Sequence, residues 1–144
     1  MPGDLGTCYF AEQPEGCFLE AFKNFSTGVP IAELQMRRLA RIEIPQPLSI
    51  ADCTAEGARA WGVTAEIHSS PDYAQTQAWA AALAHSGFDG ICYFLRHDPA
   101  QRLIGIALFG PAGSPSGYPT PDSGPIGRDL TERIKDRFGT DILK

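Results

Sequence analysis

The chain has 144 residues, of which 43% are hydrophobic and 20% charged, and its net charge at pH 7 is −5. These values are typical of one globular domain, and the negative charge argues against a broad nucleic-acid or anionic-membrane surface. No apolar run approaches the roughly 20 residues that a bilayer-spanning helix needs. The first ten residues, MPGDLGTCYF, show no signal-peptide pattern, so we expect a cytoplasmic protein.

The first quarter of the chain predicts a strand followed by a helix. Residues 6–12 (GTCYFAE) are typical of a strand. Pro14 suits the first turn of a helix over 14–25, and Glu20 falls outside the apolar row of that helix. This row consists of three aromatic residues at helical spacing: Phe18, Phe22 and Phe25.

The next segments are shorter and less regular. Residues 31–40 can form a short helix or an irregular approach to a strand, and residues 39–45 alternate only in part. A strand is expected at 48–53. A short helix is expected at 54–63, with Thr54 as its N-cap.

The clearest helix covers residues 69–87. Ser70 is a suitable cap, Pro71 fits the first helical position and Asp72 favours the positive end of the helix dipole. Gly87 can end the helix.

Two apolar strands, 89–95 and 103–110, follow and are joined by RHDPAQR. The three polar residues that open this connection can form part of a site or merely the turn of a hairpin, and both readings stay open. They are Arg96, His97 and Asp98.

The C-terminal part begins with a Gly/Pro-rich stretch, residues 110–127, which predicts a loop. An amphipathic helix is expected over 128–138, with Asp129 and Glu132 as a capping box, and a last strand at TDIL. The whole predicts a mixed α/β (α+β) fold with short strands and flanking helices, in a single domain spanning 1–144.

Common catalytic and metal-binding motifs are missing from the sequence. The four cysteines form no CxxC pair and no zinc-type Cys/His spacing, which favours reduced, buried thiols. No dinucleotide-binding glycine motif, P-loop, GxSxG or HExxH occurs. A metal centre and a cysteine hydrolase are therefore not expected.

The order of several segments nevertheless resembles a known family. GTCYFAEQPEGCFLEAF resembles a strand ending in Tyr-x-Ala that leads to a glutamate-bearing helix, and RLARIEIPQPLSIADCT resembles a central strand pair. PDYAQTQAWAAALAHSGFDGICYFLRHDP and IGIALFG resemble the following helix, the Tyr-x-x-Arg strand end and the closing strand. Over residues 6–110 the chain thus resembles the RES-domain family.

This resemblance implies an activity and a partner. RES domains are similar in fold to ADP-ribosyltransferases, and many are toxins of bacterial toxin–antitoxin systems. Such toxins degrade NAD at the nicotinamide–ribose bond, by hydrolysis or by phosphorolysis with phosphate as co-substrate. NAD is then a substrate and no cofactor is expected. The implied protein partner is an Xre-type antitoxin, with no direct nucleic-acid or membrane contact; the oligomeric state stays open.

The resemblance also implies the site residues. Glu20 matches the family's glutamate, and Tyr9 matches the tyrosine eleven residues before it. Glu20 would stabilise the positive charge that develops on the ribose. Tyr9 and Tyr93 would pack on flat rings, and Arg96 would bind a phosphate. We expect these four residues to face one cleft.

Two departures from the family pattern motivate an alternative. No arginine precedes Arg37, although the family's arginine lies before the Tyr-x-Ala strand, so the N-terminus is expected to lack that segment. The family's serine position is occupied by Leu95, which has no hydroxyl. The alternative is a catalytically inactive RES-like module that binds a protein partner, in which Glu20 is a solvated helix carboxylate and the tyrosines are packing residues.

Overall fold

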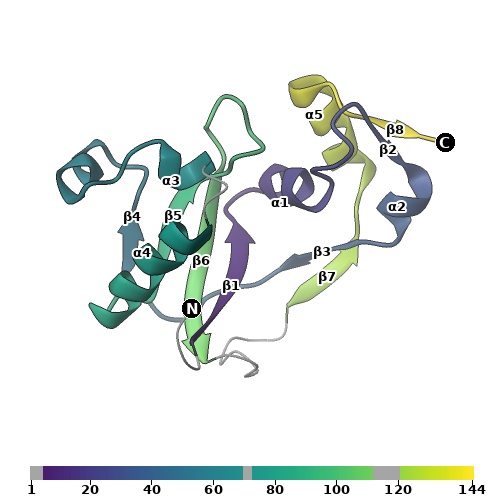
Figure 1. The fold of residues 1–144 in the computed structure, drawn as a ribbon. Helices are drawn as coiled ribbons and strands as arrows, with labels where there is room; N and C mark the ends of the chain where they lie inside the picture. Colours follow the sequence, from purple (N-terminus) through teal and green to yellow (C-terminus); the bar gives the residue numbers. More distant parts are fainter. Residues whose placement is uncertain (1–4, 70–72, 112–120) are drawn as a thin grey trace. The chain divides into compact units, whose positions relative to one another are not determined.

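The computed structural model describes residues 5–69, 73–111 and 121–144. It has the expected mixed α/β fold, in which short strands alternate with helices (Figure 1). The chain forms two compact units, each built from two separate stretches of sequence. Unit 1 consists of Met1–Glu12 and Gln46–Gly117, and unit 2 consists of Gln13–Pro45 and Tyr118–Lys144.

Unit 1 contains a four-stranded sheet in the order β1-β6-β5-β4 (Figure 1). Its strands are β1 (Leu5–Ala11), β4 (Ile50–Asp52), β5 (Gly90–Phe94) and β6 (Ile104–Pro111). β6 pairs antiparallel with both β1 and β5, whereas β4 pairs parallel with β5. The predicted hairpin of two apolar strands is therefore confirmed as β5 and β6.

The predicted helix at 69–87 is confirmed as α4 (Tyr73–His85), which packs against β5. Gly87 has a φ of 94°, a left-handed conformation that ends helices and that glycine adopts without strain. The predicted roles of Ser70, Pro71 and Asp72 concern positions outside the described residues.

The segment between β4 and α4 corrects one prediction. Residues 54–63 contain a 3-10 helix, η1 (Glu56–Trp61), followed by the short α3 (Glu66–Ser69). The N-cap of η1 is Ala55, without a side-chain cap bond, so Thr54 is not the cap. The Thr54 hydroxyl instead donates a hydrogen bond to the Asp52 carboxylate at 2.5 Å, because a turn directly after β4 brings the two side chains together.

Unit 2 consists of short helices and two pairs of strands. Its elements are α1 (Pro14–Ala21), β2 (Gly28–Pro30), α2 (Ile31–Gln35), β3 (Arg38–Arg41), β7 (Asp122–Pro125), α5 (Arg128–Phe138) and β8 (Asp141–Leu143). β2 pairs parallel with β8, and β3 pairs antiparallel with β7. Its core consists of apolar side chains from both stretches of sequence: Phe18, Leu19, Phe22, Val29, Leu34, Leu130 and Ile134.

Two further predicted boundaries are wrong. α1 ends at Ala21 rather than at Phe25, although the Phe18 and Phe22 rings do pack together with centroids 4.6 Å apart. The stretch 110–127 is not entirely a loop: β6 extends to Pro111, and β7 forms across from β3. Backbone pairing with β3 outweighs the poor strand propensity of the Asp-Ser-Gly-Pro sequence.

The terminal helix and strand lie where the sequence places them, but the capping box is wrong. The N-cap of α5 is Gly127, and no side-chain cap bond is made there. Glu132 instead accepts a hydrogen bond from Nε of Arg128 at 2.9 Å, an i,i+4 ion pair on the exposed surface of the helix.

Candidate functional site

Tyr9 lies near the middle of β1, and 71% of its surface is exposed. It pairs with Ala107 of β6, which in turn pairs with Ile91 of β5. A large aromatic side chain that is this exposed contributes little to the core. Its ring is therefore accessible for contact with another flat group.

Tyr93 lies on the same face of the sheet as Tyr9. It pairs with Gly105 of β6, which pairs with Ala11 of β1. Directly paired residues share a face and the face repeats every second residue, so the register alone fixes this relationship. The two tyrosines are separated by one strand and two residues along it, which corresponds to roughly 12 Å between Cα atoms. The β6 residues between them, Gly105 and Ala107, have the smallest side chains available.

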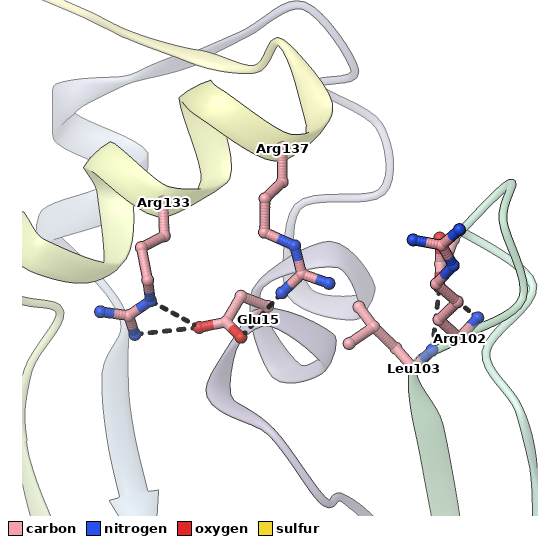
Figure 2. A network of polar contacts seen from close by, with 6 residues as sticks. Glu15, Arg102, Leu103, Arg133 and Arg137 are labelled. Carbon is pink, nitrogen blue, oxygen red and sulfur yellow. Dashed lines mark hydrogen bonds and ion pairs between the residues drawn. The ribbon is translucent and has the colours of Figure 1, made fainter.

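Arg96 follows β5 in the hairpin turn, and its side chain is exposed. The turn is organised by Asp98, which is 2% exposed. Its carboxylate accepts hydrogen bonds from three backbone N–H groups: those of Ala100 at 3.1 Å, Arg102 at 2.7 Å and Leu103 at 2.9 Å. Figure 2 labels two of these donors, Arg102 and Leu103. Asp98 therefore has a structural role in the hairpin, and the exposed Arg96 belongs to a turn whose backbone Asp98 holds in place.

Leu95, at the position where the sequence resemblance places a serine, is 2% exposed. Its side chain belongs to the core of unit 1 and lies on the same side of the strand as Tyr93. Its Cδ2 atom would be 2.7 Å from a Cβ atom added at Gly105, so Leu95 fills part of the space above that glycine. Position 95 thus contributes packing and has no polar group for a ligand.

Glu20 lies in the last turn of α1 and is half-buried. It belongs to unit 2, whereas Tyr9, Tyr93 and Arg96 belong to unit 1. The structure therefore brings the two tyrosines onto one face and Arg96 to the strand end. That Glu20 shares a cleft with them stays a prediction.

Sequence reasoning missed His68, which is 7% exposed. Its Nδ1 accepts a hydrogen bond from the backbone N–H of Phe94 at 3.0 Å, and the two rings meet edge to face with centroids 5.2 Å apart. Burial lowers the pKa of His68, and a hydrogen bond with the Cys53 backbone opposes this in part. The neutral imidazole thus joins the ends of β4 and β5 next to Tyr93. A single histidine in a short helix gives no sequence signal for this role.

A second group lies at the same strand ends. Asp52 accepts hydrogen bonds from the Thr54 hydroxyl and, at 3.1 Å, from the Cys92 thiol, and these bonds lower the pKa of Asp52. Burial and the neighbouring Asp52 carboxylate raise the pKa of Cys92 to about 12. Burial likewise raises the pKa of Cys53. Both thiols are therefore protonated at neutral pH, which is the opposite of what a nucleophilic cysteine requires.

The cysteines differ in exposure from the prediction that they are buried. Cys53 is buried and Cys17 and Cys92 are half-buried, but Cys8 is exposed because it lies on the edge strand β1. None of the four is in a disulfide bond. Within residues 5–69, 73–111 and 121–144, no three His, Cys, Asp or Glu side chains gather as they would around a metal ion.

Among the described residues of unit 2, Glu15 is the one carboxylate that is buried. It lies in the first turn of α1 and is held by Arg133 and Arg137 of α5 (Figure 2). The sequence alone shows only an acidic residue near the N-terminus of a helix, and acidic residues are common at that position.

Comparison with known proteins identifies the family. The family model described as RES domain matches residues 2–129 of the 144-residue chain. The chain therefore belongs to the RES-domain family, as the ordered motifs indicated. Neither the curated proteins nor the solved structures gave a match. None of the helices that the structure describes is long and apolar enough to cross a membrane.

Proposed function

We propose that this RES-domain protein cleaves the nicotinamide–ribose bond of NAD. The observation that carries the proposal is the shared sheet face of Tyr9 and Tyr93 in a chain that matches the RES domain over residues 2–129. Two aromatic side chains, one of them 71% exposed, are a suitable surface for the flat rings of a dinucleotide. Arg96, exposed at the adjoining strand end, provides a cation for the pyrophosphate.

The proposed reaction needs no metal and no redox step. Water or phosphate attacks C1′ of the nicotinamide ribose, the bond between C1′ and the ring nitrogen breaks, and nicotinamide leaves as a neutral molecule with the bonding electrons. With water as the nucleophile, one proton passes to solvent. Positive charge develops on the ribose before the new bond is complete, and a carboxylate stabilises it. We assign that role to Glu20.

The proposed biological role is that of a cytoplasmic toxin inhibited by an Xre-type antitoxin. A protein that destroys a cofactor used throughout the cell requires an inhibitor in the cell that makes it. The net charge of −5 suits a protein partner better than nucleic acid.

A second candidate is an inactive RES-like module that binds a protein partner. It is favoured by one observation: Leu95, at the serine position, is 2% exposed and cannot contact a ribose or phosphate. Glu20 and the tyrosines are then surface or packing residues without catalytic roles.

One experiment separates the two candidates. Purified protein is incubated with NAD, with and without inorganic phosphate, and nicotinamide is measured by chromatography. Release above the rate of a heat-denatured control supports NAD cleavage, and dependence on phosphate identifies the nucleophile. No release under either condition, from protein shown to be folded by circular dichroism, favours the inactive module.

A further inference from the structure

The most buried ion-pair cluster in the described residues joins the first turn of α1 to α5. The side chain of Glu15 is only 8% exposed. Arg133 contacts Oε1 of Glu15 through Nε at 3.0 Å and through Nη2 at 2.9 Å, and Nη1 of Arg137 contacts Oε2 at 3.1 Å. Figure 2 shows the carboxylate between the two guanidinium groups. We name this cluster, Glu15 with Arg133 and Arg137, the α5 clamp.

A buried carboxylate is stable only when its charge is compensated and both oxygens are hydrogen-bonded. The α5 clamp meets both conditions, because each oxygen of Glu15 has its own arginine. A guanidinium group binds a carboxylate with a fixed geometry, so the contact restrains orientation as well as distance. The clamp thus fixes where the first turn of α1 lies against α5.

α5 is itself well anchored within unit 2. Leu130 and Ile134 are 5% and 0% exposed. Gly139 ends the helix in a left-handed conformation with a φ of 71°, and the Thr140 hydroxyl then donates to the Ser26 carbonyl at 2.6 Å. β8 follows and pairs with β2. α5 is therefore a rigid frame against which α1 can be positioned.

α1, in contrast, depends on its surroundings. It has eight residues, and its N-cap, Gln13, makes no side-chain cap bond. Helices of this length are not stable alone in water. Its orientation is therefore determined by the buried Phe18 and Leu19 on one side and by the α5 clamp at its first turn.

Glu20 lies on the same short helix but outside the clamp. It follows Glu15 by five residues, which corresponds to a rotation of roughly 140° about the helix axis and a rise of about 7.5 Å. Its carboxylate thus points away from the clamp but moves with the helix. A tilt at the first turn is carried to Glu20 as a displacement on the ångström scale.

We propose that Glu15 is a positioning residue: the α5 clamp fixes helix α1 and thereby the place of the Glu20 carboxylate. This inference rests on the proposed function, which gives Glu20 its catalytic role. Both arginines come after residue 129, where the match to the family model ends. The C-terminal helix of this chain therefore supports the site although it lies mostly outside the matched region.

The test is Glu15→Gln, which keeps the shape of the side chain and removes its charge. The matched control is Arg128→Gln, which breaks an ion pair on the same helix at a position where the side chain is 89% exposed. Two quantities are measured for each folded variant: kcat and KM for nicotinamide release from NAD, and amide hydrogen exchange over residues 14–21. If Glu15→Gln does not fold, Arg137→Gln takes its place, because it leaves the Arg133 contact intact.

We expect Glu15→Gln to lower kcat by about tenfold to a hundredfold with little change in KM, because a 1 Å misplacement of a catalytic group can have that effect. Exchange should become faster in residues 14–21, and Arg128→Gln should match the unmodified protein in both measurements. An unchanged kcat in Glu15→Gln, or an equal loss in Arg128→Gln, overturns the inference and leaves the proposed function intact. If the unmodified protein releases no nicotinamide, the proposed function fails. In that case amide hydrogen exchange tests the clamp. Faster exchange confined to α1 in Glu15→Gln supports the clamp, and unchanged exchange overturns it.

Discussion

Tyr93 lies directly opposite Gly105 in the β5–β6 pair, and its ring occupies the space that a side chain on Gly105 would need. A Cβ atom at position 105 would lie 2.7 Å from Cζ of Tyr93 and 2.7 Å from Cδ2 of Leu95. The Tyr93 ring can therefore take this position only because residue 105 of the neighbouring strand β6 is a glycine.

Gly105→Ala should therefore destabilise the protein by about 1–3 kcal/mol, because Leu95 is buried and cannot move aside freely. Chemical denaturation measures this change. Gly110→Ala is the control on the same strand, since nothing lies within 4 Å of its added Cβ. Equal midpoints for the two variants would show that the space above Gly105 is not restricted.

Replacing Glu20 by Gln tests the proposed chemistry. The substitution keeps the shape and removes the charge that stabilises the ribose, so NAD cleavage should be abolished. The melting temperature should stay nearly unchanged, because Glu20 is only half-buried and the ion pairs among the described residues do not include it. Unchanged nicotinamide release would remove Glu20 from the mechanism, whereas a large drop in melting temperature would assign it a structural role.

His68 should make stability depend on pH. Burial lowers its pKa in the folded protein, so the unfolded chain binds the proton first as the pH falls. The free energy of unfolding should be independent of pH above the histidine pKa of the unfolded chain, about 6.5. Below that pH it should decrease by up to about 1.4 kcal/mol per pH unit, until the pH reaches the pKa of His68 in the folded protein. The free energy of unfolding at pH 7.5 and 5.5 measures this loss. It should shrink in His68→Gln and persist in His85→Gln, which alters an exposed residue; an identical loss in both variants would contradict the assignment to His68.

Cys92 should react slowly with alkylating agents at pH 8, because its pKa of about 12 leaves almost no thiolate. Asp52→Asn replaces the charged acceptor beside the thiol with a neutral amide, so the pKa of Cys92 should fall and its alkylation should accelerate. Site-resolved mass spectrometry measures both rates. The rate at Cys8, which is exposed on β1, serves as the internal reference. A rate at Cys92 that does not respond to Asp52→Asn would mean that burial alone protects the thiol.

Asp98→Ala should destabilise the protein by about 2–5 kcal/mol. It removes the acceptor of three backbone N–H groups at a position that is 2% exposed, and a hydrogen bond to a charged group contributes about 1.5–3 kcal/mol. The loss is smaller than three such bonds, because Ala100 and Arg102 are exposed and their N–H groups can bond to water instead. Urea denaturation gives the value, with Asp136→Ala on the exposed surface of α5 as control. A loss as small as that of the control would mean that the turn forms without the carboxylate.

The sequence predicted those parts of the fold that local patterns determine. α4 and the β5–β6 hairpin are continuous segments with strong periodicity and glycine or polar ends, and both are where the sequence indicated. β7 could not be predicted, because Asp122–Pro125 has low strand propensity and pairs only through its distant partner β3. Thr54 and Asp129 are good caps by residue type, but η1 begins after Ala55 and α5 begins after Gly127, and neither helix has a side-chain cap bond.

The candidate site shows the same division. The motif resemblance, not a physical pattern, led to the prediction of the four site residues Tyr9, Tyr93, Arg96 and Glu20. His68 and Glu15 were missed because their roles depend on tertiary contacts with Phe94 and with α5. One buried histidine and one helix carboxylate look ordinary until the structure shows what surrounds them.

The strand pairings determine when the protein can complete its fold. Leu5 pairs with Pro111 in unit 1, and Pro30 pairs with Leu143 in unit 2. Contacts between residues so far apart in sequence form slowly, because a long loop must close before they are gained. During synthesis the sheet of unit 1 cannot form until β6 has been made, and the β2–β8 pair of unit 2 cannot form until β8 has been made. A nascent chain that lacks β6 or β8 therefore lacks part of the fold of one unit, and neither unit can be completed by its N-terminal stretch alone.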